Sequence, residues 1–242
     1  MAERAAQRSG RLGIGIIGAG RVGPVLGAAL AGAGHAVVGI SAVSEASRDR
    51  ADAMLPGVPI LEIPDVIERS ELVILAVPES QLEALVAGLA AAGVLQPGQL
   101  VLHTAAGYGT AVLAPATAQG AIPLAVHPAM SFTGTSVDRY RLHESYFAVT
   151  APTVVQPIGQ ALVVEMGAEP VIVAEEDRAA YAEAIATATS FSAAIVGQSM
   201  GILQKLGIEQ PGRLIAPLVR SSVENALGVQ VADAIDLSEL EE

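Results

Sequence analysis

Two apolar runs in the middle of the chain each end in a histidine. His103 closes LVLH and His127 closes IPLAVH, and a proline follows His127 directly. Residues 84–137 include no Asp, Glu, Lys or Arg, so imidazole is the main group in this window that can exchange protons near neutral pH. We therefore predict catalytic roles for His127 and His103, with Thr104 beside them to orient a substrate. A structural role, in which the rings bond backbone groups, is the open alternative.

A glycine-rich loop follows the first apolar run of the chain. The segment GAGRVG fits the pattern G-x-G-x-x-G and stands between a predicted strand and a predicted helix. In such a loop the first glycine makes a tight turn, the second lets backbone approach a pyrophosphate, and the third allows close helix–strand packing. The segment therefore predicts a dinucleotide site. Its residues are Gly18, Ala19, Gly20, Arg21, Val22 and Gly23.

The end of the second predicted strand indicates which dinucleotide is bound. An NAD enzyme usually has an acidic residue there, about 20 positions after the loop, to bind the ribose 2′-hydroxyl. Here Ser41 takes that position, and Ser44 and Arg48 follow. Hydroxyls and a guanidinium suit the 2′-phosphate of NADP, so we expect NADP rather than NAD. Val77 and Pro78, at the end of the next buried strand, are expected to border the nicotinamide.

The composition excludes several classes of partner and site. The 242 residues carry a formal net charge of −12, which argues against binding to nucleic acid or to an anionic membrane. The absence of cysteine excludes disulfides and thiolate metal sites and fits a cytoplasmic protein. The glycines of the apolar segment 12–40, together with Arg21 and His35, argue against a membrane span. Neither His103 nor His127 has a carboxylate or a second histidine at ligand spacing, so we expect no metal.

The order of the predicted elements indicates an α/β fold. Apolar strands alternate with helices, which is typical of a parallel, doubly wound sheet. The predicted strands are 13–17, 35–42, 71–77, 99–103 and 121–127, followed by shorter strands at 146–150 and 170–174. We expect a dinucleotide-binding domain at 12–174 after a disordered segment at 1–11.

The rest of the chain is predicted to be helical. An alanine-rich run covers 175–206 and a further helix covers 212–227, so we place a helical domain at 175–230 and an acidic tail at 231–242. A helical part of this size buries too little apolar surface to form an independent core. Charged residues also make up only 16% of the chain. We therefore expect a homodimer formed through the helical domain. Polar residues on its first helix either face a substrate or permit close packing; they are Glu183, Thr187, Ser190 and Ser192.

Four segments carry a resemblance to a known family. GIIGAGRVG, LVILAVPES, LVLHTAAG and LAVHPAMSF occur in this order, and together they resemble a Rossmann-type reductase family whose C-terminal helical domain is labelled domain of unknown function 2520. That family is similar to ketopantoate reductases and pyrroline-5-carboxylate reductases. The resemblance covers roughly residues 12–228. It implies an NADP-linked reductase, often dimeric, with the active site between a sheet domain and a helical domain.

The chain departs from this family in two places. Ser190 and Phe191 stand where members usually carry an Asn-His pair, and an acidic tail stands where members continue with further helices. The lysine that donates a proton in ketopantoate reductases has no recognisable counterpart, so Lys205 is given no such role. We expect an NADPH-dependent oxidoreductase that reduces a small oxo-acid or imino-acid, with a ketopantoate-like compound the first choice. The alternatives are an NADP-binding sensor or scaffold without turnover and a deazaflavin-dependent oxidoreductase.

Overall fold

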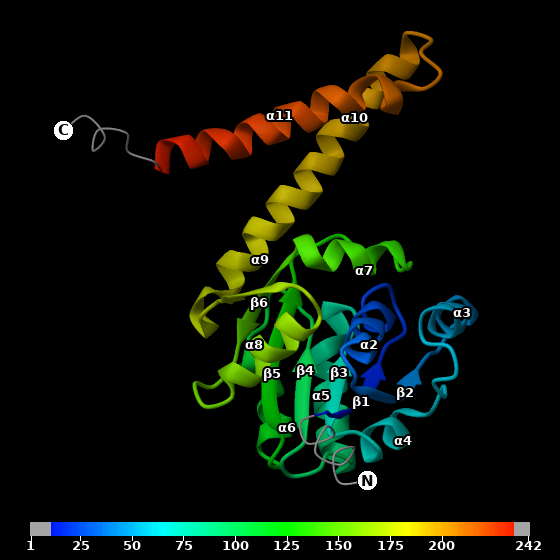
Figure 1. Cartoon of the computed structure of the whole chain (residues 1–242), viewed down its shortest axis with the longest axis vertical. Helices are drawn as coiled ribbons and strands as arrows, with labels where there is room; N and C mark the ends of the chain where they lie inside the picture. The colour runs from blue at the N-terminus through cyan, green and yellow to red at the C-terminus, as the bar shows by residue number, and fades with distance from the viewer. Residues whose placement is uncertain (1–10, 235–242) are drawn as a thin grey trace, which may run out of the picture. The chain divides into compact units, whose positions relative to one another are not determined.

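Seven strands form one sheet in the computed structural model, which describes residues 11–234 (Figure 1). The order of strands across the sheet is β2-β1-β3-β4-β5-β6-β7. Each predicted strand is present, with ends within two residues of those expected. The strands are β1 (Gly13–Ile17), β2 (Ala36–Ser41), β3 (Leu72–Leu75), β4 (Leu100–His103), β5 (Ile122–Pro128), β6 (Tyr146–Thr150) and β7 (Glu169–Ile172).

Helices cover both faces of the sheet, which confirms the doubly wound α/β fold. Helices α2 (Gly23–Gly32) and α8 (Gln156–Glu165) share one apolar core with the sheet, and α4 (Ile63–Glu68) and α5 (Glu79–Ala92) share a second. Alternate residues of β3 enter the two cores, so this strand must be apolar throughout. The connections also contain α3 (Glu45–Met54), α6 (Ala114–Thr117), α7 (Val137–Arg141) and 3-10 turns at Thr110–Leu113, Leu142–Glu144 and Glu175–Asp177.

Strand β6 runs opposite to β5, so the sheet is parallel except at this one pairing. His127 on β5 lies opposite Ala148 on β6 in an antiparallel pair. The chain between them holds only α7 and one 3-10 turn, which is too short to return it to the far edge of the sheet. The chain therefore enters β6 from the edge at which β5 ends. Helix α8 then makes a full crossover, and β7 pairs parallel with β6.

The chain divides into two compact units, Met1–Glu183 and Ala184–Glu242. The first contains the sheet. The second contains α10 (Ser192–Lys205) and α11 (Pro211–Ala234), so both predicted helical stretches are present. The sheet unit extends to Glu183, and the domain boundary expected near residue 174 stays a prediction. Helix α11 continues past residue 231, where the acidic tail was expected to begin; residues 235–242 and 1–10 lie outside the described part of the chain.

One helical run joins these units along the sequence. It comprises α9 (Arg178–Ala186), a π-helical stretch (Thr187–Phe191) and α10. By length and composition alone, the run Glu175–Lys205 could cross a membrane, with a mean hydropathy of 1.3. Arg178 near its start is only 1% exposed and bonds to the sheet, so the first turns belong to the sheet unit. The expected absence of a membrane partner stays a prediction.

Candidate functional site

Each glycine of the predicted loop meets a different steric demand. Gly18 has a φ of +104°, and a Cβ there would overlap the carbonyl of Ala76, just after β3. A Cβ on Gly23 would overlap the Gly18 carbonyl oxygen, so the third glycine lets α2 begin directly against the loop. A Cβ on Gly20 would meet nothing within 4 Å. The backbone at Gly20 is thus open to a ligand, as the approach of a pyrophosphate requires.

The N-terminus of α2 adds an anion-binding element to this loop. Val22 stands at the N-cap position, no side chain caps the helix, and its first turn has no acidic residue. The amides of this turn therefore have no competing side-chain acceptor. Ala19 is buried beneath the loop, whereas the Arg21 side chain is exposed. Loop and helix end together fit a dinucleotide diphosphate.

Ser41 and Ser44 are both used by the fold. Ser41 is buried, and its Oγ accepts a 3.2 Å hydrogen bond from Gly18 N, which fixes the glycine loop to the end of β2. Ser44 caps α3: its Oγ accepts from Ser47 N at 3.2 Å, and Ser47 Oγ accepts from Ser44 N at 3.0 Å. Ser44 is exposed and keeps its hydroxyl proton for donation. Ser41 supports the loop from below and does not face solvent.

Arg50, which was not among the predicted site residues, bonds directly to the glycine loop. Arg48 is exposed on α3. Arg50 turns back, and its Nη1 donates to Ala19 O at 2.8 Å. A Cβ on Gly134 would lie 3.1 Å from both Arg21 Cγ and Arg50 Cδ, so these two arginines meet beside the loop. Their sequence positions give no sign of this, because Gly134 belongs to the distant β5–α7 connection.

His103 is held by backbone on both sides of its ring. It is fully buried, its Nδ1 accepts from Ala105 N at 3.2 Å, and its Nε2 lies 2.8 Å from Gly109 O. Because Nδ1 is the acceptor, Nε2 carries the proton and donates to Gly109 O. Both ring nitrogens therefore make a hydrogen bond to the backbone. Burial is the main cause that lowers the pKa of His103 to about 4. The ring shapes the loop after β4, and Thr104 follows it in a half-buried position.

His127 faces a tyrosine that the sequence analysis did not select. Its Nδ1 lies 2.9 Å from Tyr181 Oη, and the two rings meet edge to face at 77°. Tyr181 lies on the second turn of α9, within the sheet unit. It could have been suspected as an aromatic hydroxyl on the first helix after the sheet. The polar residues for which the sequence left a substrate-facing or a packing role open are all exposed; they are Glu183, Thr187, Ser190 and Ser192.

Arg178 anchors Tyr181 to the sheet. Its Nε donates to Thr150 Oγ1 at 2.7 Å, and its Nη2 donates to Ala125 O at 2.9 Å and to Ala148 O at 3.1 Å. Its guanidinium carbon also lies 5.8 Å from the centre of the Tyr181 ring, within the range of a cation–π contact. Residues three apart share a helix face, so the buried arginine fixes the direction of the phenol.

The surroundings shift the acidity of both members of the His127–Tyr181 pair. Burial, aided by the positive charge of Arg178, lowers the pKa of His127 to about 4. Burial raises the pKa of Tyr181, and Arg178 opposes that rise. Near pH 7 the imidazole is therefore neutral and the phenol keeps its proton. A phenol that holds a proton beside a buried cation can donate it, because the cation stabilises the phenolate left behind.

The carboxyl ends of β1, β3, β4 and β5 lie at one edge, since these strands are parallel. Val77 is half-buried and Pro78 exposed just beyond β3. The next residue, Glu79, accepts from Gly107 N in the loop after β4, at 3.5 Å. The edge therefore gathers the glycine loop, the Val77–Pro78 turn and His127. Within the described residues, no three His, Asp or Glu side chains are grouped to hold a metal.

Solved structures similar to this chain include several reductases. A Bacteroides fragilis protein, provisionally described as an NADP oxidoreductase, matches with a TM-score of 0.73 and 20% identity, over 89% of this chain and 80% of its own. The 1-pyrroline-5-carboxylate reductase of Streptococcus pyogenes gives 0.66 and 19%, over 93% and 85%. The reductive aminase of Aspergillus terreus, in complex with NADPH4, cyclohexanone and allyl amine, gives 0.67 and 16%, over 93% and 78%.

Sequence comparison assigns both parts of the chain to known domain families. No curated protein sequence matches it significantly. Residues 145–235 match the domain of unknown function DUF2520, and residues 1–128 match the Rossmann-like domain, as the resemblance implied. The first match covers β1 to β5, whereas the second begins at β6, inside the sheet unit, and continues through the helical unit. The chain belongs to the Rossmann-like family and carries a DUF2520 region in its C-terminal part.

Proposed function

We propose that this chain is an NADPH-dependent oxidoreductase that reduces a small oxo-acid or imino-acid. The geometry of the glycine loop carries the proposal, because Gly18 and Gly23 are required by packing while Gly20 leaves open backbone at a helix N-terminus. The similar structures support it, since they include a pyrroline-5-carboxylate reductase and a reductive aminase complexed with NADPH4.

Separate groups would hold the parts of the cofactor. The amides of the loop and of α2, with Arg21, would bind the diphosphate. Ser44 and Arg48 would bind the 2′-phosphate, and the inward-turned Arg50 would bring a second guanidinium to the same region. Ser41 would act through the loop that it supports. Val77 and Pro78 would border the nicotinamide.

The His127–Tyr181 pair would supply the proton. NADPH, when bound, supplies the hydride. Tyr181 would donate its phenolic proton to the carbonyl oxygen or imine nitrogen of the substrate. His127, with its proton on Nδ1, would hold the phenolic oxygen by donating to it, and Arg178 would stabilise the resulting phenolate. His103 would act by shaping the loop that carries Thr104, whose hydroxyl would orient the substrate.

The test compares binding with turnover. Purified protein is titrated with NADPH, NADH and a deazaflavin nucleotide, and NADPH oxidation is followed with a panel of cyclic imino acids and 2-oxo acids that includes ketopantoate. We expect tight NADPH binding and turnover of at least one compound. NADPH binding without turnover would favour the sensor alternative. Binding of a deazaflavin nucleotide alone would favour the third alternative, and binding of none of these would refute the proposal.

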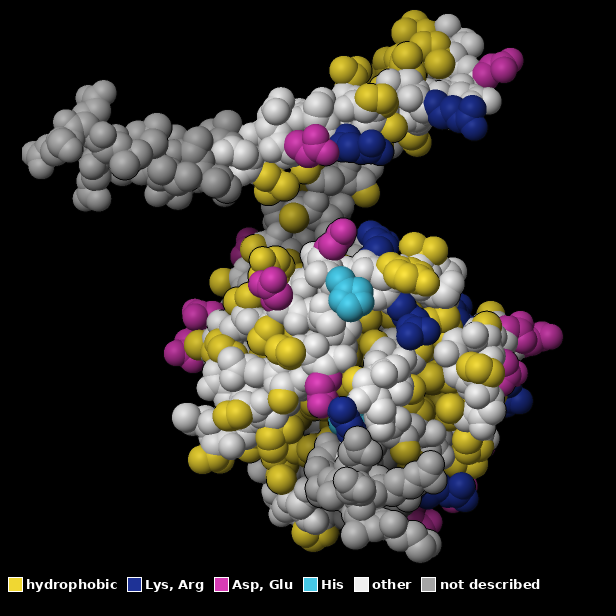
Figure 2. Space-filling view, viewed as in Figure 1, with side chains coloured by type: hydrophobic (Ala, Val, Ile, Leu, Met, Phe, Trp, Pro, Cys, Tyr) yellow, Lys and Arg dark blue, Asp and Glu magenta, His cyan; other side chains and the backbone are white. Residues whose placement is uncertain are grey.

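A second copy of the chain would cover the helical unit. Between residues 184 and 228 only Pro211 is buried, so this unit lacks a core of its own. Apolar side chains are spread along it (Figure 2). Its most exposed large apolar residues are Phe191, Ile195, Ile202, Leu206, Leu214, Leu218, Val223 and Leu227. A homodimer would bury such a surface. Sedimentation should show a dimer, and a Leu206→Glu/Leu218→Glu variant should shift it toward monomer; a monomeric wild type would refute this assignment.

A further inference from the structure

We propose that a hollow between α2, α7 and α8 is a second binding site, which takes a small carboxylate or phosphate. Its volume is about 420 Å³, within the range of about 300–1,000 Å³ that is usual for small-molecule sites. It lies wholly within the sheet unit. The floor is formed by the last turns of α2, roughly one helix length (about 14 Å) from the glycine loop. It is therefore separate from the proposed cofactor site.

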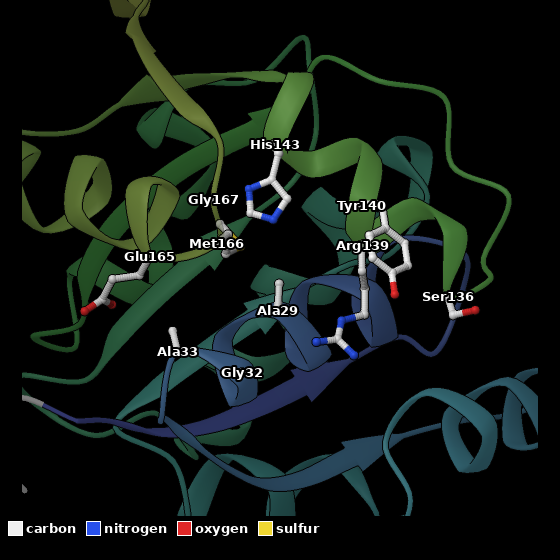
Figure 3. Close-up of a pocket in the computed structure, with 10 residues that line it drawn as sticks. All are labelled: Ala29, Gly32, Ala33, Ser136, Arg139, Tyr140, His143, Glu165, Met166 and Gly167. Atoms are coloured by element: carbon white, nitrogen blue, oxygen red, sulfur yellow. The ribbon is translucent and has the colours of Figure 1, made fainter.

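The hollow gathers side chains that donate hydrogen bonds. Arg139 reaches into it from α7 toward Gly32, and His143, from the following turn, lies against Gly167 (Figure 3). A Cβ on Gly32 would lie 3.4 Å from Arg139 Nη2, so the guanidinium lies directly above the small-residue floor. Among the described residues, neither Arg139 nor His143 has a hydrogen-bonded or ion-paired side-chain partner. A planar guanidinium with unused N–H groups suits an oxyanion.

The single carboxylate in the wall is already neutralised. Glu165 Oε1 accepts from Arg11 Nη1 at 2.8 Å, and its Oε2 lies 2.7 Å from His35 Nε2. His35 Nδ1 accepts from Leu12 N at 3.0 Å, so its Nε2 carries the proton that bonds Glu165. The negative charge of Glu165 thus faces two partners outside the hollow. Arg139 is left as the uncompensated charge, in a chain whose net charge is −12.

The two helix C-termini at the hollow offset this charge only in part. A helix C-terminus repels anions chiefly through carbonyls that lack a partner. At the end of α2, the carbonyls of Ala29, Leu30 and Ala31 accept from the amides of Ala33, His35 and Gly34. At the end of α8, the carbonyls of Leu162, Val163 and Val164 accept from the amides of Met166, Ala168 and Gly167. The polar groups left facing the hollow are mainly donors: Arg139, His143, Ser136 and Tyr140.

A short path connects this site with the nucleotide loop. Asp138, beside Arg139, is fully buried and accepts from Thr133 N at 2.8 Å and from Gly134 N at 2.7 Å. Gly134 in turn lies against Arg21 and Arg50. An anion that fixes Arg139 would therefore also fix the loop that borders the proposed diphosphate site. By thermodynamic reciprocity, the anion and NADPH would change each other's affinity by the same factor.

The test is a titration of the full chain with inorganic phosphate and, separately, succinate, followed by amide NMR without any nucleotide. We expect saturable shifts at Gly32, Ala33 and Gly167 with at least one probe. Saturation by phosphate alone or succinate alone would identify the oxyanion. No saturable shift up to roughly 10 mM, at which a site of 1 mM Kd would be about 90% filled, would overturn the proposal.

Variants separate this site from general charge effects. Arg139→Gln and His143→Gln should each weaken binding at least tenfold, whereas Arg69→Gln, at an exposed arginine after α4, should not. Equal weakening in all three would also overturn the proposal. Because this readout needs no cofactor, it stands even if NADPH does not bind. Where NADPH binds, an anion Kd that is unchanged by saturating NADPH would refute the path through Asp138.

Discussion

His127 Nδ1 lies 2.9 Å from the hydroxyl of Tyr181, and this bond joins residues 54 positions apart in the sequence. If the phenol is the proton donor, Tyr181→Phe removes the proton while it keeps the ring over Arg178. We expect kcat to fall by about 10²–10⁴ with little change in the Kd for NADPH. The measurement is NADPH oxidation with the best compound of the panel. Tyr146→Phe, at a half-exposed tyrosine on β6, is the matched control; equal losses in both would exclude the role.

The glycine loop predicts a separation of binding from stability. Gly20→Ala adds a methyl group where nothing lies within 4 Å, so thermal unfolding should barely change while NADPH binding weakens by tenfold or more. Gly18→Ala must adopt a φ of +104° against Ala76, so it should lose stability as well. Gly88→Ala, in an open interior position on α5, is the control: it should leave NADPH binding unchanged and raise stability by about 0.5–1 kcal/mol, because alanine favours a helix interior. Unchanged NADPH binding by Gly20→Ala would refute the loop assignment.

Two arginines give different expectations for cofactor selectivity. Arg48→Ala should weaken NADPH binding strongly and leave NADH binding unchanged, because only the 2′-phosphate is lost as a partner. Arg50→Ala also removes the bond to Ala19 O, so it should weaken both nucleotides. Fluorescence titrations of each variant with both nucleotides check this. Equal weakening of the two nucleotides by Arg48→Ala would remove Arg48 from the 2′-phosphate site.

Arg178 is expected to be the most sensitive polar residue of the sheet unit. Arg178→Met leaves the acceptors on Thr150, Ala125 and Ala148 without their donor, which should lower the free energy of unfolding by about 2–5 kcal/mol. Arg69→Met, at an exposed arginine, should change it by less than about 0.5 kcal/mol. Urea unfolding at neutral pH measures both. A loss for Arg178→Met no larger than for Arg69→Met would show that this network contributes little.

The two strand-end histidines predict a loss of stability in acid. The pKa of each is lowered from 6.5 to about 4 in the folded chain. Between these values the unfolded chain binds more protons, so stability is fully present above pH 6.5 and falls as the pH drops toward 4. The slope is up to roughly 1.4 kcal/mol per pH unit for each histidine. Urea unfolding from pH 7 to 4 should show a shallower decline in His103→Gln/His127→Gln; identical slopes would contradict the shifted pKa values.

The strands and the glycine loop could be predicted from the sequence, because each is determined by neighbouring residues. A run such as ELVILAV is apolar throughout because both faces of a central strand are buried. The pattern G-x-G-x-x-G reflects three steric requirements that arise within six residues. The direction of β6 is different, because it depends on whether the chain between residues 129 and 145 crosses the sheet. No periodicity in that stretch reveals its path.

The same distinction separates the site residues that were found from those that were missed. His127 could be selected because it ends an apolar strand. Tyr181 could only have been suspected from its place on the first helix after the sheet. Arg178 could not be selected, since its contacts with β5 and β6 are made only in the folded chain. Ser41 was selected for its position at the end of β2, where its hydroxyl accepts from Gly18 N in the glycine loop. Its role in cofactor binding stays a prediction.

The reversal of β6 decides where the last helix of the sheet unit can start. Because β6 and β7 both lead away from the edge where β5 ends, α9 begins beside Ala125 and must travel toward His127. The first turns of α9 therefore pack against β5 and β6 before the helix extends beyond the sheet. An alanine inserted after Ala180 would rotate the phenol by about 100° around the helix axis without removing any side chain. The number of residues between Arg178 and Tyr181 therefore determines the direction of the phenol, and with it whether Tyr181 contacts His127.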